Sequence, residues 1–438
     1  NDSSNDNAGK ISQPSQAYSD GYQLGLDVAR TLEYTRSHAN VLQDTSATDQ
    51  NASTDQARSA FNGAVKGFAD GQDTATQHSL DSNQSGAYKK AYTIASVEAS
   101  QQYEQGKQKF LTGVLNDHSK DDTNVDDVAY NRGYNETSDG YTDGMKIPQV
   151  QRGNSTGYVA GYNKGTAIAN SFQSAQEGNS EYTGEDKSTG AFSPQETFDA
   201  AKAGFEDAQA LNEPNANSDK TISYQNAYNL AYNEYKDAIA KGSQQYLDGN
   251  GSGNTDSKNF VDKATARGFA ITNDGFNDGY TSANNNSPHT PTNYTDVTYT
   301  RGYNAGTGAS AFVYAKQYDS TNADQSTGYQ EASDGFNFAA SGNDESQIPA
   351  DKRGQAAFMK GFDVYTQYKR GIEDGSIKDG TKQSTDEDYG DAYQATQSAR
   401  QNFFHYSTVD NSGKTPIYQS IYSVKAKDFL KQYEAGKN

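Results

Sequence analysis

Oxygen-bearing side chains alternate with glycine between residues 248 and 256, in a pattern that could bind a metal ion. The candidate ligands are Asp248, Asn250, Ser252, Asn254 and Asp256. Gly253 stands at the sixth position, where an EF-hand loop turns sharply, but the twelfth position is Asn259 and not the bidentate glutamate of that motif. The segment is therefore a candidate calcium loop, with a plain polar loop between two helices as the alternative.

Other catalytic chemistry has little support in the sequence. The chain has no cysteine, and it lacks the Gly-x-Ser-x-Gly turn of serine hydrolases and a paired-histidine zinc motif. Its five histidines, His38, His78, His118, His289 and His405, share no neighbours and are expected to be solvated. Paired carboxylates could support glycoside hydrolysis, but acidic residues are so frequent that pairs carry no signal. We expect no enzymatic activity and no resident cofactor, and keep a hydrolase as a remote alternative.

Tyrosine is the remaining side chain with functional chemistry, because it can stack on a sugar ring and donate a hydrogen bond. The chain contains 32 tyrosines and 41 glycines among 438 residues. Those spaced four residues apart are predicted to lie in the core. Tyr182 and Tyr294, which lie off this pattern, are predicted to be at the surface.

The chain repeats a pattern of a small or short residue before an aromatic one, twice, four residues apart. The lead aromatics are Tyr18, Tyr88, Tyr158, Tyr224, Tyr299, Phe358 and Tyr418. A second, looser series falls between them, so that one unit contains two elements and spans roughly 60–75 residues. The units begin near residues 17, 87, 157, 223, 298, 357 and 416.

These elements are predicted to be helices. Aromatic and aliphatic residues recur every three or four positions, as in Tyr18, Tyr22 and Leu26, and this spacing places them on one helical face. Ser193–Glu196 reads as a capping box with proline at the first helical position. A glycine inside an exposed helix costs about 1 kcal/mol relative to alanine. We therefore expect the glycines to form grooves that receive a ring or the backbone of a neighbouring helix.

The predicted fold is all-α, with about thirteen helices in six to seven tandem helical-hairpin repeats, stacked as a solenoid or an elongated bundle. Residues 1–16 are predicted to be a flexible N-terminal segment and residues 17–435 the helical repeat array. Disorder of most of the chain is the alternative, because the mean hydropathy is −1.00 and the net charge is −20. The regular spacing of the aromatic residues argues against it.

Charge and composition restrict the partners. An acidic chain does not favour nucleic acid or an anionic membrane as the main partner, and no apolar stretch is long enough to span a membrane. The absence of cysteine and the abundance of asparagine, serine, threonine and glutamine favour an extracellular or cell-surface location.

The small–aromatic repeats in an acidic, polar chain resemble helical repeat proteins that lactobacilli and related Gram-positive bacteria secrete or display on their walls. The resemblance spans residues 17–435 and implies an adhesive or structural function. We therefore expect a non-enzymatic extracellular repeat protein that binds itself or cell-surface components and self-assembles into a layer or fibre. The alternative is a module that binds a glycan or a host protein through exposed tyrosine and asparagine.

Overall fold

The computed structural model describes residues 15–42, 52–72, 80–113, 124–186, 188, 190, 192–216, 218–251, 256–285, 297–314, 316–377, 387–405 and 413–435. These residues form α-helices and two short 3-10 helices, without a strand among them, which confirms the all-α prediction. The helices are α1 (Gln16–Ser37), α2 (Asp55–Gln72), α3 (Gly86–Leu111), α4 (Val125–Gly144), α5 (Thr156–Gln176), α6 (Pro194–Ala210), α7 (Ile222–Leu247), α8 (Phe260–Asn285), α9 (Val297–Val313), α10 (Ala323–Ala340), α11 (Ala356–Ser376), α12 (Glu387–His405) and α13 (Pro416–Ala435). The 3-10 helices are Ala39–Leu42 and Glu345–Gln347.

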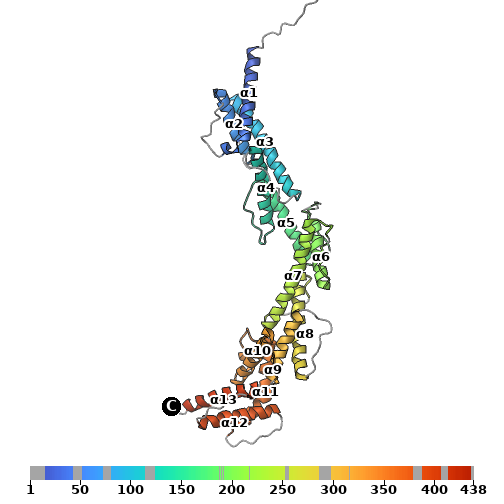
Figure 1. The fold of residues 1–438 in the computed structure, drawn as a ribbon, viewed down its shortest axis with the longest axis vertical. Coiled ribbons are helices and arrows are strands. Elements are labelled where there is room, and N and C mark those ends of the chain that lie inside the picture. Colours follow the sequence, from blue (N-terminus) through green and yellow to red (C-terminus); the bar gives the residue numbers. More distant parts are fainter. Residues whose placement is uncertain are drawn as a thin grey trace, which may run out of the picture. The chain divides into compact units, whose positions relative to one another are not determined.

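The chain packs as two compact units. One contains residues 1–204 and 215–229, and the other contains residues 205–214 and 230–438. Within each unit, consecutive helices pack in pairs, such as α2 with α3, α4 with α5 and α8 with α9 (Figure 1). The first fourteen residues of the predicted flexible segment lie outside the described residues.

Helix starts follow a repeated local signal. Ser15, Ser85 and Ser155 each accept a hydrogen bond from the amide of the tyrosine three residues later, at 3.2–3.3 Å. Such a serine satisfies one of the amides that a helix N-terminus leaves without a partner. The recurring Ser-x-x-Tyr sequence therefore fixes both where a helix begins and where its first aromatic ring lies.

The predicted capping box at α6 forms on one side only. The helix begins at Pro194, and the Ser193 hydroxyl accepts the amide of Glu196 at 3.2 Å. The Glu196 carboxylate instead accepts a hydrogen bond from Thr221 at 2.9 Å, just before α7. This glutamate therefore joins two consecutive helices.

Paired helices run in the same direction. A Cβ atom at Gly140 of α4 would overlap the carbonyl oxygen of Tyr158 in α5, and one at Gly144 would overlap that of Tyr162. From the first contact to the second, the position advances by four residues in α4 and also by four residues in α5. Only helices that run in the same direction show this register. The glycines of α2 against α3, α8 against α9 and α11 against α12 show the same register.

The repeat unit thus differs from the predicted hairpin, in which two helices run antiparallel. The spacing of small residues defines a packing face but does not encode chain direction. The segment between Gly144 and Thr156 is long enough to return the chain, because an extended residue spans about 3.3 Å. The partners are also offset along their axes, so that the return distance is short.

The core consists of aromatic rings and alanines. Phe336 is buried in one unit, in edge-on contact with Phe312, Tyr365 and Tyr368 at centroid distances of 5.5–5.8 Å. In the other unit, Phe68 lies among alanines of α2, α3 and α4. Most of the described helical glycines lie against the backbone of a neighbouring helix; Gly157 lies against the Tyr103 side chain instead, and Gly21, Gly25 and Gly86 have no atom within 4 Å of an added Cβ atom. The predicted groove therefore receives a backbone, and the rings fill the space on either side.

Candidate functional site

A recurrent junction joins the end of one helix to the start of the next. In α4 and α5, Gly140 and Gly144 lie under the α5 backbone, and Asp143 stands between them. The Tyr158 hydroxyl of α5 donates to Asp143 Oδ2 at 2.6 Å. The two glycines bring the backbones together, and this close approach lets the phenol reach the carboxylate. This arrangement of two glycines, an aspartate and a tyrosine is termed the Tyr–Asp junction below.

Three further helix pairs form the same junction, with glycine, aspartate and tyrosine at the same relative positions. The tyrosine-to-aspartate hydrogen bonds are Tyr92 to Asp70 (3.0 Å), Tyr299 to Asp278 (2.6 Å) and Tyr389 to Asp374 (2.6 Å). In each pair the aspartate belongs to a Gly-Φ-x-Asp-Gly segment, where Φ is an aromatic or aliphatic residue. These segments begin at Gly67, Gly140, Gly275 and Gly371.

The electrostatics favour a protonated phenol that donates to a carboxylate. Burial, reinforced by the hydrogen bond to Asp70, raises the pKa of Tyr92 to about 12. Burial also raises the pKa of Tyr299, with the nearby Asp278 acting in the same direction. At Asp143, the Lys146 ammonium and the Tyr158 hydroxyl lower the pKa of the carboxyl. The junction is therefore intact across the physiological pH range.

We expect Tyr299→Phe to lower the free energy of unfolding by about 1–2 kcal/mol, because it removes the donor from a carboxylate that accepts it in a partly buried contact. Tyr22→Phe is the matched control, since Tyr22 is 62% exposed and Tyr299 is 2% exposed. Urea denaturation followed by circular dichroism measures both. Equal effects of the two substitutions would contradict a stabilising role for the hydroxyl.

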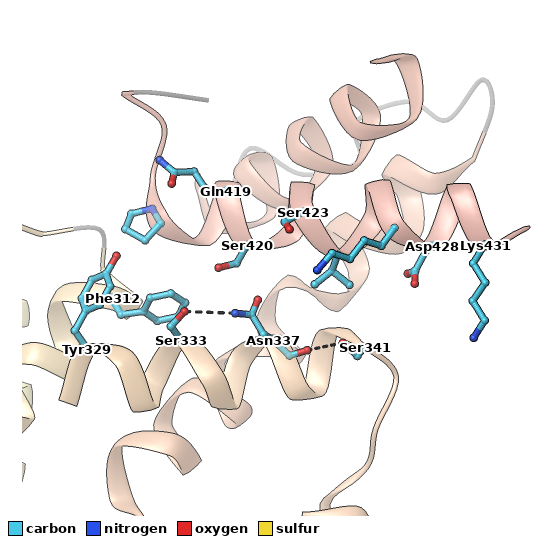
Figure 2. Close-up of a pocket in the computed structure, with 13 residues that line it drawn as sticks. Phe312, Tyr329, Ser333, Asn337, Ser341, Gln419, Ser420, Ser423, Asp428 and Lys431 are labelled. Atoms are coloured by element: carbon cyan, nitrogen blue, oxygen red, sulfur yellow. Dashed lines mark hydrogen bonds between the residues drawn. The ribbon is translucent and has the colours of Figure 1, made fainter. Parts of the chain in front are cut away.

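A groove of about 650 Å³ lies between α10 and α13, and Phe312 of α9 is one of the residues that line it. Figure 2 shows Ser333, Asn337 and Ser341 along α10, facing Ser420 and Ser423 of α13. The side-chain amide of Asn337 donates to the Ser333 hydroxyl at 3.4 Å, and the backbone carbonyl of Asn337 accepts from the Ser341 hydroxyl at 2.8 Å. The volume is in the range of small-molecule sites, and amide and hydroxyl groups on both walls match the hydrogen-bonding groups of a sugar.

An aromatic ring closes one end of this groove (Figure 2). Tyr329 contacts Phe312 edge-on at a centroid distance of 5.5 Å and stacks on Tyr318 at 4.4 Å. Burial raises the pKa of Tyr329 to about 12. The ring is thus held rigidly beside the polar walls.

The candidate calcium loop is described only in part. Ser252 and Asn254 lie outside the described residues, whereas Asp248, Asn250 and Asp256 lie within them. The amide of Asn250 donates to the carbonyl of Gln245, that of Gly249 donates to Tyr246, and Gly249 has a φ of +70°. These bonds form the Schellman motif that ends a helix, and they account for the glycine at position 249. The Asp248 carboxylate accepts from Gln244 at 2.8 Å.

Metal ligands do not gather elsewhere in the described part of the chain: it contains no group of three or more histidine, aspartate or glutamate residues placed to hold an ion. His38 is exposed at the end of α1, as predicted, and stacks on Tyr34 at 4.2 Å. His78, His118 and His289 lie outside the described residues.

Two predictions about tyrosine exposure were wrong. Tyr182 was expected at the surface but is 7% exposed and packs against Phe198 at a centroid distance of 6.3 Å, because the segment after α5 folds back over α6. Tyr18 and Tyr22 were expected in the core but are 64% and 62% exposed. Nothing in the described chain packs against the start of α1, which leaves these rings uncovered. Tyr294 lies outside the described residues.

A half-buried carboxyl lies on α10 between Gly328 and Gly335. Burial raises the pKa of Glu331 to about 7, against the opposing effect of the Lys352 ammonium and with additional repulsion from Asp248 and Asp334. The pKa of Glu331 therefore lies in the neutral range.

Sequence reasoning found the tyrosines and glycines of the junctions but not their pairing. The signal that could have revealed it is the recurrence of Gly-Φ-x-Asp-Gly in the helix that precedes a Tyr-x-x-x-Tyr helix. The aspartates gave no signal of their own, because acidic residues are frequent throughout the chain.

No protein-family model matches the chain, and neither a curated protein nor a solved structure matches it significantly. None of the described helices combines the length and apolar character needed to cross a membrane.

Proposed function

We propose that the chain is a non-enzymatic structural repeat protein of the extracellular surface, with an adhesive or assembling role. The observation that carries this proposal is the Tyr–Asp junction, which occurs four times with one geometry among the described helices. Tyrosine and glycine are the residue types that distinguish the composition of this chain. Together with aspartate, they join consecutive helices. Such use is typical of a framework built by repetition, in which neighbouring units supply the stability.

The acidic charge sets the conditions for assembly. Copies that each carry a net charge of −20 repel one another at low ionic strength. Salt at physiological concentration reduces the Debye length to about 8 Å and weakens this repulsion. A divalent cation such as calcium would weaken it further by pairing with surface carboxylates.

Assembly is tested by light scattering coupled to size-exclusion chromatography and by negative-stain microscopy, over a range of protein concentrations. We expect filaments or lattices that become more abundant at physiological salt and with added calcium. A protein that stays monomeric at high concentration, with and without calcium, would contradict self-assembly.

The groove between α10 and α13 favours a second candidate function, the binding of a glycan. Its walls combine the side chains of Asn337, Ser420 and Gln419 with the ring of Tyr329, and aromatic rings and amides are groups that bind sugars. This candidate does not require self-assembly.

A glycan array tests it, with Ser420→Trp as the blocking variant because Ser420 lies on the groove wall (Figure 2). Ser218→Trp, at an exposed position outside the groove, is the control. We expect binding by the native chain and the control but not by the blocked variant. An array without signal for the native chain would remove this candidate.

A further inference from the structure

The start of α1 repeats a sequence that is buried in two other helices. Tyr-x-x-Gly-Tyr-x-x-Gly occurs in α1 from Tyr18 to Gly25, in α5 from Tyr158 to Gly165, and in α9 from Tyr299 to Gly306. The two rings also adopt the same stacked arrangement in each helix, with centroid distances of 6.5, 6.4 and 6.3 Å.

In α5 and α9 both glycines of this sequence are covered by the preceding helix. A Cβ atom at Gly161 or Gly165 of α5 would overlap carbonyl oxygens of α4, and the same holds for Gly302 and Gly306 of α9 against α8. In each case the covering helix carries Gly-Φ-x-Asp-Gly and its aspartate accepts from the first tyrosine. Two examples in one structure thus define what binds this sequence.

In α1 the same positions are open. No atom would lie within 4 Å of a Cβ atom at Gly21 or Gly25. Tyr18 is 64% exposed, whereas its counterpart Tyr158 is 7% exposed. The exposed rings and the bare glycines lie on one helix face, with the same Ser-x-x-Tyr start as α5.

We propose that the N-terminal half of α1 is a docking surface for a helix that carries Gly-Φ-x-Asp-Gly. The two glycines of that helix would lie under the carbonyls of Tyr18 and Tyr22, and its aspartate would accept the Tyr18 hydroxyl. The occupant is supplied by a partner polypeptide of the same construction. A second copy of this chain does not supply it, because the four such helices of the described residues already pack on their own tyrosine helices. This inference stands on the internal repetition and does not depend on the proposed function.

The α4 segment of the chain itself is the probe. Residues 124–154, which comprise α4 and its connection to α5, are placed before Ser15 in the full chain in place of residues 1–14. Ser15 then follows the graft as Ser155 follows the native segment. Ala17 stands where α5 has Gly157, and its methyl group would lie about 3.0 Å from Thr137 Oγ1 of the graft, a contact that a small shift relieves.

Docking is measured by nitration of Tyr18 and by hydrogen exchange of the amides of α1, both read by mass spectrometry. We expect the graft to slow both reactions by on the order of tenfold or more, because a covered helix opens less often. The control graft carries Gly140→Leu and Gly144→Leu, which block the close approach, and we expect it to leave both rates unchanged.

Each outcome decides the proposal. Docking on α1 is what would order the grafted helix. If nitration of Tyr18 and hydrogen exchange of α1 are as fast with the unmodified graft as without it, the proposal is overturned. Equal protection by the control graft overturns the role of the glycines. Protection of Tyr18 in the ungrafted chain that grows with protein concentration would show that a second copy is the occupant, and would overturn the assignment to a different partner. Protection by the unmodified graft alone, at any concentration, supports the proposal.

Discussion

Replacement of Gly161 by alanine is expected to destabilise the unit that contains α4 and α5 by about 3 kcal/mol. The new methyl group would overlap the carbonyl oxygen of Thr137 and press on the amide of Tyr141. Overpacking of this kind costs about 1–3 kcal/mol and occasionally more. The upper part of this range applies because the obstacle is backbone, which no rotamer change can move aside.

Gly21→Ala is the matched control, because Gly21 holds the equivalent position in α1 and no atom would lie within 4 Å of the added methyl group. Alanine favours a helix over glycine by about 1 kcal/mol, so this variant is expected to stabilise α1 slightly. Differential scanning calorimetry should therefore show opposite signs, with the Gly161→Ala midpoint roughly 5–10 °C below that of the native chain. A Gly161→Ala variant as stable as the native chain would contradict the close parallel packing.

Glu331→Gln is expected to stabilise the protein at pH 8 and to remove part of its pH dependence. The folded state holds the proton of Glu331 more tightly than the unfolded chain, since its pKa rises from 4.5 to about 7. The stability associated with the protonated carboxyl is thus complete below pH 4.5 and is lost as the pH rises through 7.

The size of this effect follows from the pKa change. One pH unit corresponds to about 1.4 kcal/mol, so the full difference would amount to about 3 kcal/mol. Partial access of water to the side chain reduces the expected gain for Glu331→Gln at pH 8 to about 1–2 kcal/mol. At pH 4 the variant and the native chain should be nearly equal.

Urea denaturation at pH 4, 6 and 8 measures this difference. Asp55→Asn is a suitable control, because Asp55 has an almost fully exposed side chain at the start of α2. A Glu331→Gln variant whose advantage in stability does not grow between pH 4 and pH 8 would show that the half-buried carboxyl does not govern stability in this pH range.

Local signals in the sequence predicted the helices and many of their starts. Period and capping are properties of one helix, and both are visible in segments such as Ser155 to Gly165. The spacing of tyrosine and glycine also indicated a core in which rings pack beside small residues. Glycine weakens a helix, so several glycines on one helix face indicate that a neighbouring element lies close to them.

The direction and pairing of the helices could not be predicted in this way. A row of glycines packs against a parallel or an antiparallel neighbour alike, so that the contact of Gly140 with Tyr158 carries no directional signal in the sequence. The Asp143 carboxylate acquires its role only when Tyr158 is brought to it by tertiary packing. Tyr18 is the opposite case. The sequence around it matches the sequence around the buried Tyr158, yet Tyr18 is exposed because no helix among the described residues covers it.

The common direction of paired helices gives each pair an electrical polarity. The peptide dipoles of a helix act as about half a positive charge at its N-terminus and half a negative charge at its C-terminus. In an antiparallel pair these moments cancel, whereas in α4 with α5 or α8 with α9 they add. Each such pair therefore has a dipole moment along its axis that is larger than that of either helix alone, with its positive end at the two N-termini and its negative end at the two C-termini.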